Sequence, residues 1–133
     1  MRAAGLVAAL AAAAVLVLVA GTASASVTQY PTVFTKFKYK LDNGKAEFKG
    51  QIGSQKGGCV PDRKVKLFRQ KNGKKSKLGG DHTNGKGHFE IDLGSGRPKN
   101  GKYYAEVLQT KIGSSSNRKT CLARTSRSVK LSS

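Results

Sequence analysis

Serine and histidine are the residue types in this sequence that could support nucleophilic catalysis. A catalytic serine needs a general base and an oxyanion hole that the fold places beside it, and His82 and His88 are the only histidines available as the base. Both flank Asn84-Gly85, a turn signal at which exposed polar residues are expected. Asp81 adjoins His82, but neighbouring residues of a strand point to opposite faces. The sequence therefore predicts no catalytic residue and no enzyme.

Cys59 and Cys121, the only two cysteines, are the residues with metal-binding or redox chemistry. Two thiolates cannot fill the four positions of a structural zinc site, and His82 and His88 lack the spacing of additional ligands. Two cysteines in an exported chain are expected to pair, and the N-terminus described below indicates export. We therefore expect a Cys59–Cys121 disulfide with Cα atoms about 4.4–6.8 Å apart, and neither a metal site nor another cofactor.

The basic residues carry most of the functional information. The chain has 25 lysines and arginines against seven aspartates and glutamates, a formal net charge of +18. The acidic residues lie mostly beside lysines and are expected to be their solvated partners. A surface built from lysines would attract anionic polymers by a sequence-independent, salt-sensitive mechanism. Lysines that recur at alternate positions or cluster around one turn are the candidate polyanion-binding residues: Lys36, Lys38, Lys40, Lys64, Lys66, Lys71, Lys74, Lys75 and Lys77.

Outside a cell, such a surface fits teichoic polymers, acidic polysaccharides and anionic lipid head groups. The alternative is that the lysines keep the protein soluble and protect its edge strands. Specific nucleic-acid recognition is not expected, because most aromatic residues fall on apolar faces. Only Tyr30, Phe34, Phe68 and Tyr104 remain as side chains on which bases could stack.

The first 25 residues have the pattern of a signal peptide. Met1-Arg2 supplies a positive charge, Leu6 to Ala20 form an apolar run, and Ala23-Ser24-Ala25 is a small-residue cleavage signal. A run of about 15 residues is shorter than the roughly 20 that a spanning helix needs. We therefore expect cleavage before Ser26 and a secreted or cell-envelope protein without a membrane anchor. Residues 26–133 would form one domain, and loss of Arg2 alone would lower the net charge from +18 to +17.

Turn residues divide this mature chain. Asn-Gly-Lys occurs four times, starting at Asn43, Asn72, Asn84 and Asn100, and Asn-Gly is the strongest short-range hairpin signal because both residues tolerate positive φ. Gly57-Gly58 and Gly79-Gly80 are also expected to be turns. The close spacing of these signals leaves no room for a long helix.

Between the turns, apolar residues recur at every second position, which is typical of half-buried antiparallel strands. In the first such segment Val33, Thr35, Phe37, Tyr39 and Leu41 share one face. The pattern predicts an all-β fold, an antiparallel Greek-key-type β-sandwich of six or seven strands. The strands are expected near residues 33–41, 45–52, 63–70, 86–93, 102–109 and 127–131.

Three segments also resemble a known group of modules. They are Val65-Lys66-Leu67, Gly87-His88-Phe89-Glu90-Ile91 and Gly101-Lys102-Tyr103-Tyr104-Ala105-Glu106-Val107. Over residues 60–107 the chain resembles the bacterial prealbumin-like sandwiches, which include carboxypeptidase regulatory-like and immunoglobulin-like modules. The resemblance implies a sandwich fold with a non-catalytic accessory or binding role, and it carries no functional residues.

The favoured interpretation is a secreted binding or accessory module that uses a lysine-rich face at the cell envelope. The alternative is a secreted inhibitor or toxin-like effector that acts on a protein partner through a loop such as Lys111–Thr120. Gly113-Ser114-Ser115-Ser116-Asn117 within that loop is polar and flexible in composition, which suits a mobile loop better than a rigid inhibitory one.

Overall fold

The computed structural model describes residues 28–132, and the predicted signal peptide lies outside this range. The described part is all-β, as predicted, and its one helical element is a short 3-10 turn, Gly57–Cys59. No helix of residues 28–132 is long and apolar enough to span a membrane. The strands are β1 (Gln29–Tyr30), β2 (Thr32–Asp42), β3 (Lys45–Ser54), β4 (Lys64–Lys71), β5 (Lys74–His82), β6 (His88–Ser95), β7 (Gly101–Val107), β8 (Thr110–Ile112), β9 (Lys119–Cys121), β10 (Arg124–Thr125) and β11 (Val129–Leu131).

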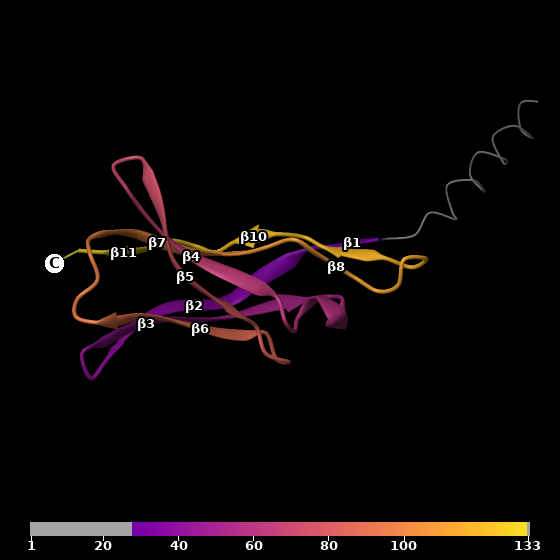
Figure 1. Ribbon diagram of the computed structural model, residues 1–133, viewed down its shortest axis with the longest axis horizontal. Helices are drawn as coiled ribbons and strands as arrows, with labels where there is room; N and C mark the ends of the chain where they lie inside the picture. The colour runs from indigo at the N-terminus through magenta and orange to yellow at the C-terminus, as the bar shows by residue number, and fades with distance from the viewer. Residues whose placement is uncertain (1–27, 133) are drawn as a thin grey trace, which may run out of the picture.

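Each of the six predicted ranges overlaps one of these strands, but the structure has more strands than predicted. They form three sheets: β2–β3–β6, β10–β7–β4–β5 with β11 also paired to β7, and the small sheet β1–β9–β8. Every pair is antiparallel except β1–β9, which is parallel. Figure 1 shows the two larger sheets as two layers, with the small sheet extending from one end.

The two larger sheets share one apolar core. Alternate side chains of β3, β6, β4 and β7 point into it, because successive residues of a strand face opposite sides. Phe48 stacks between Phe37 and Tyr103, with ring centroids 5.2 and 5.3 Å away, and so joins the two layers. The buried core residues are Phe37, Phe48, Ile52, Val65, Leu67, Phe89, Ile91, Tyr103, Ala105 and Val107.

A β-bulge changes the first part of β2 from the predicted pattern. The pairing of β2 with β3 shifts register between Phe34 and Lys36, and an extra residue in one strand moves the following side chains to the other face. Phe34 therefore packs against the core, while Val33 is 44% exposed. The expectation that Val33 and Thr35 share the face of Phe37 is wrong, and Phe34 is not an exposed stacking residue.

The four Asn-Gly pairs divide into two kinds. Asn43-Gly44 and Asn72-Gly73 join β2 to β3 and β4 to β5, and all four residues have positive φ between 52° and 77°. These are the predicted two-residue hairpins. Asn84-Gly85 and Asn100 instead lie in connections that pass from one large sheet to the other, and Gly101 begins β7.

Gly79-Gly80 is part of β5 and is not a turn, which corrects the expectation from the sequence. A Cβ on Gly80 would lie 2.9 Å from the carbonyl oxygen of Val65, and one on Gly79 would lie 3.1 Å from Ile91. Glycine is needed here because β5 passes close to the backbone of β4 and to the core, not because the chain reverses.

The connection from β5 to β6 is held by hydrogen bonds. The Asn84 Oδ1 accepts the backbone N–H groups of Lys86 (2.9 Å) and His88 (3.0 Å). The Gly87 carbonyl accepts the N–H of Ile52 at 2.9 Å, and a Cβ on Gly87 would lie 2.3 Å from the Ile52 carbonyl oxygen. These contacts fix the position of His88, the first residue of β6.

Replacement of Gly87 by alanine is therefore expected to destabilise the protein by about 2 kcal/mol or more, because φ is +83° and the new methyl group meets backbone. Gly44→Ala is the matched control, since φ there is +76° with nothing within 4 Å of the added Cβ, and its cost should be about 1 kcal/mol. Urea unfolding of both variants measures the difference. Equal losses would contradict the close contact at Gly87.

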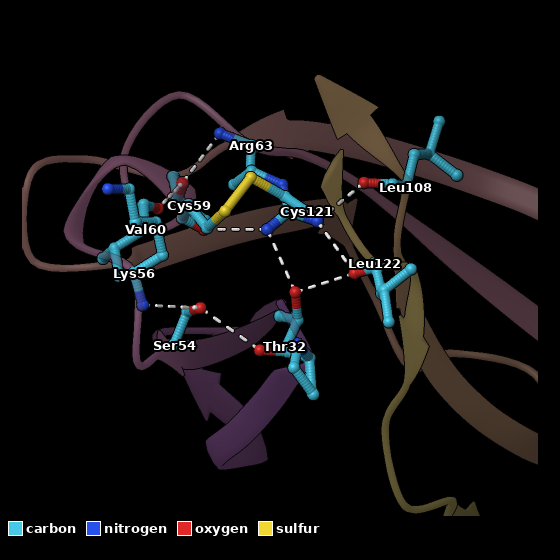
Figure 2. Close-up of a disulfide and its surroundings, with 11 residues drawn as sticks. Thr32, Ser54, Lys56, Cys59, Val60, Arg63, Leu108, Cys121 and Leu122 are labelled. Carbon is cyan, nitrogen blue, oxygen red and sulfur yellow. Dashed lines mark hydrogen bonds between the residues drawn. A yellow bond between two sulfur atoms is a disulfide. The ribbon is translucent and has the colours of Figure 1, made fainter. Parts of the chain in front are cut away.

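A disulfide and a buried arginine join the small sheet to the rest of the chain. Cys59 and Cys121 are bonded, with Cα atoms 5.4 Å apart, within the predicted range. Arg63 is 1% exposed. Its Nη1 donates to the Cys59 carbonyl (2.7 Å) and Thr32 Oγ1 (3.0 Å), and its Nη2 donates to the carbonyls of Leu108 (2.8 Å) and Leu122 (3.1 Å). Figure 2 shows the guanidinium beside the disulfide with these acceptors around it. We call Arg63 and its four acceptors the arginine clasp.

Candidate polyanion-binding surface

Six lysines lie on the outer face of the sheet that contains β4 and β7. Lys66, Gln70 and Lys102 alternate with the buried Leu67 and Tyr103, and strand pairing places Lys130 opposite Lys102 and Lys75 opposite Gln70. Five of the six are exposed, and Lys66 is half-buried. We call this set the lysine face: Lys64, Lys66, Lys75, Lys77, Lys102 and Lys130.

Two lysines of this face are direct cross-strand neighbours. Lys102 of β7 is paired with Lys130 of β11, so their Cβ atoms are about 5 Å apart, and like charges at this spacing destabilise a sheet. Lys71 lines the same hollow of about 500 Å³ beside them. No acidic side chain lines this hollow within the described residues. An anion bound here would relieve the repulsion.

Aromatic side chains occupy the middle of the lysine face. Phe68 and Tyr104 are stacked across β4 and β7, with ring centroids 5.7 Å apart. The Lys75 ammonium lies 4.1 Å from the centroid of Phe68 and 3.7 Å from the Glu106 carboxylate. Lys75 is therefore engaged by its neighbours, whereas the structure records no ion pair of Lys66, Lys77, Lys102 or Lys130 in residues 28–132.

The other predicted lysines lie elsewhere. Lys36, Lys38 and Lys40 point outward from β2 in the opposite layer. Lys71 and Lys74 face each other beside the turn of the β4–β5 hairpin, which projects beyond the layers in Figure 1. The structure therefore divides the nine candidates between two outer faces and a hairpin tip. One straight polymer segment cannot contact them all.

The outer face of β2–β3–β6 has a mixed charge. Strand pairing puts Lys38 beside Lys49 and Glu90, and Lys40 beside Glu47 and Asp92. Lys49 forms ion pairs with Glu47 at 3.4 Å and Glu90 at 3.8 Å. Acidic side chains thus offset much of the positive charge on this face.

Glu47, Glu90 and Asp92 form a carboxylate cluster that the sequence analysis missed. One oxygen from each lies within 4.8 Å of the others. A hydrogen bond shared with Glu90 lowers the pKa of Glu47, and the same hydrogen bond, together with the charge of Glu47, raises the pKa of Glu90. The sequence alternation places these carboxylates at outward positions of β3 and β6, but only the pairing of the two strands shows that they lie close together.

Lys102 and Lys130 were also absent from the candidate lysines. Each alternates with apolar residues of its strand, so an outward direction was readable from the sequence. Their proximity was not, because 28 positions separate them and the β7–β11 pairing brings them together.

The loop considered for the alternative function connects β8 to β9. Residues 113–118 are exposed, and the Asn117 N–H donates to the Ser114 carbonyl at 3.1 Å. The loop is anchored at one end through Cys121. The exposed large apolar residues among those described are Val33, Leu41 and Leu78, and none of them lies in this loop.

Comparison with protein families, with curated proteins and with solved structures finds no match to this chain.

Proposed function

We propose that this protein is a secreted, non-catalytic β-sandwich module that binds anionic cell-envelope or extracellular polymers through the lysine face. The observation that carries the proposal is the Lys102–Lys130 pair beside the hollow that Lys71 also lines. Teichoic polymers, acidic polysaccharides and anionic lipid surfaces have the required charge.

The shape of the fold supports the sandwich part of the proposal. Two mainly antiparallel sheets contribute to one core, and the chain passes between them after β3, β5 and β6. Such crossings are typical of Greek-key sandwiches, including the prealbumin-like and immunoglobulin-like modules. A disulfide supports export, since disulfides persist in oxidising compartments.

The charge distribution supports the binding part. Glu106 is the acidic residue on the lysine face, and it is engaged with Lys75. On the opposite outer face three carboxylates lie among the lysines. Solubility alone requires neither this asymmetry nor like charges placed side by side.

The test is retention on heparin and on purified teichoic polymer across a salt series. We expect Lys66, Lys77, Lys102 and Lys130 changed together to glutamine to weaken binding by about tenfold or more at 0.1 M salt, because each lysine near an anionic surface contributes about 1 kcal/mol. The slope of log affinity against log salt should also fall, since fewer counterions are released.

The matched control changes four other lysines to glutamine: Lys40, Lys45, Lys111 and Lys119. It removes the same net charge and leaves the lysine face intact. Early elution of the unmodified protein would show that the lysines serve solubility. Equal weakening of test and control variants would contradict a localised binding face.

A further inference from the structure

A second basic site lies mainly on the opposite layer, β2–β3–β6, and extends to the end of β5. An open groove of about 480 Å³ runs where β5 and β6 meet the outer face of β2–β3–β6. Five basic side chains line it: Lys36, Lys38, Lys49, His82 and His88. They come from four strands. The β3–β6 pairing places His88 opposite Gln51, whereas His82 is paired with Lys64 of β4 and lines the groove from the other sheet.

Strand register orders these groups into two rows. Lys36, Gln51 and His88 form one row across β2, β3 and β6, and Lys38, Lys49 and Glu90 form the next. Cross-strand neighbours in a row have Cβ atoms about 4.5–5.5 Å apart. Long side chains in adjacent rows can therefore reach one small anion between them.

The frame of the groove is fixed by hydrogen bonds. The Gln51 Nε2 donates to the Lys86 carbonyl at 3.1 Å, and the Asn84 Oδ1 accepts the backbone N–H of His88 at 3.0 Å. These hydrogen bonds hold the β5–β6 connection in place and so fix the shape of the groove.

Two carboxylates line the groove and would repel a bound anion, but each of them interacts with a neighbouring group. The Asp81 carboxylate accepts the backbone N–H of Glu90 at 2.8 Å. Glu90 pairs with Lys49 and lies in the cluster with Glu47 and Asp92. The shared hydrogen bond with Glu47 and the Glu47 charge raise the pKa of Glu90, so acidification removes its charge sooner than that of an ordinary glutamate.

We propose that this groove is a second anion-binding site, one that takes a single sulfate or phosphate group and binds it more tightly as the pH falls from 7.5 to 5.5. Histidine is the side chain that gains positive charge in this interval. Lys36 and Lys38 supply positive charge throughout this range, and Lys49 supplies charge that Glu47 and Glu90 partly offset. The site adjoins one end of the lysine face, because His82 is the cross-strand partner of Lys64, but it does not rest on the function of that face.

Sulfate is the probe, because it stays a dianion throughout this pH range. Titration followed by NMR on the histidine ring protons, at ionic strength matched with chloride, should show saturable shifts of His82 and His88. Affinity should rise by about fivefold or more from pH 7.5 to 5.5, the effect of about one added charge interaction. The His82→Gln/His88→Gln variant should bind weakly with little pH dependence.

Two further variants make the result specific. Glu90→Gln should raise sulfate affinity at pH 7.5, because it removes a negative charge from the lining of the groove. The variant with four substitutions on the lysine face should bind sulfate as the unmodified protein does, so that loss of polymer binding and loss of this site are told apart.

A phosphodiester probe, bis-glycerol phosphate, identifies the source of the anion. Binding of the diester with the same pH dependence supports an internal group of a polymer. Binding of sulfate and inorganic phosphate without the diester supports a free or terminal anion. Shifts no larger than those with chloride, or a pH dependence that survives in the double histidine variant, would overturn the proposal.

Discussion

Replacement of Arg63 by methionine is expected to lower the free energy of unfolding of the mature protein by about 3–5 kcal/mol, because it removes four hydrogen bonds from a charged donor and leaves buried acceptors without that donor. The guanidinium is the charge that three carbonyls and one hydroxyl face. Methionine fills similar volume but donates no hydrogen bond. Each acceptor left buried without a partner costs about 1–3 kcal/mol.

The arginine clasp is unusual because no carboxylate among residues 28–132 forms an ion pair with Arg63. Burial lowers the pKa of the guanidinium, yet arginine stays charged in proteins. The carbonyl dipoles therefore stabilise the charge. Lysine cannot replace this geometry, because a planar fork reaches acceptors on several segments at once, and Arg63→Lys should restore little of the loss.

Chemical denaturation followed by circular dichroism measures this effect. Arg97→Met, at an exposed position, is the matched control and should change stability by less than about 0.5 kcal/mol. Thr32→Val removes the hydroxyl that accepts from Arg63 and donates to the Leu122 carbonyl at 2.7 Å, and should cost about 1–2 kcal/mol. A loss in Arg63→Met no larger than in Arg97→Met would show that the clasp is energetically unimportant.

The sequence predicted the strands that have an apolar face. β3, β6 and β7 alternate strictly, so their inward residues were readable from Phe48, Phe89 and Tyr103. β5 was missed because it is an edge strand whose residues are lysines, glycines and other polar types, so no apolar period marks it. Pairing with β4 holds it in place, and pairing is a tertiary property.

The short strands were missed for a related reason. β1, β8, β9 and β10 have two or three residues each, too few to show a period of two. The arginine clasp could not be predicted either, because nothing in this strongly basic sequence distinguishes Arg63 from an exposed cationic residue. Its acceptors come from four separate segments, and only the fold brings them together.

The sequence predicted the type of candidate site but not all of its residues. A lysine-rich surface was expected, and the structure does place Lys64, Lys66, Lys75 and Lys77 on one outer face. Lys36, Lys38 and Lys40 belong to the other layer because β2 pairs with β3 and not with β4. The alternation of a single strand gives the direction of a side chain relative to its own sheet, but not the sheet to which the strand belongs.

Removal of the disulfide is the other change with a large expected effect. Cys59 and Cys121 are 62 positions apart, and closing a loop of that size restricts the unfolded chain enough to stabilise the fold by about 4 kcal/mol. The Cys59→Ala/Cys121→Ala variant should lose this amount, less any strain relieved. Free-thiol titration of the exported protein under denaturing conditions should find no thiol, and two titratable thiols would rule the bridge out.

Removal of the disulfide should lower local stability more in some parts of the molecule than in others. β8 and β9 are mostly outside the core, and β9 is joined to the rest through β1, Cys121 and the clasp. Hydrogen exchange of the double alanine variant should accelerate most at the amides of Thr120 and Leu122, which donate to the Thr28 and Tyr30 carbonyls. The amides of β3 and β7 should change only as much as global stability does. Uniform acceleration would contradict a locally held sheet.

The disulfide and the arginine clasp hold the same junction, so their effects should not add. Without the bridge, we expect water to reach the clasp and to hydrate part of the carbonyl groups that now accept from Arg63. Arg63→Met should therefore cost at least about 1 kcal/mol less in the Cys59→Ala/Cys121→Ala background than in the parent, a coupling typical of residues in contact. Gly44→Ala, in an open turn, should cost the same in both backgrounds within about 0.5 kcal/mol. If Arg63→Met lowered the free energy of unfolding equally in the two backgrounds, the disulfide would not be excluding water from the arginine clasp.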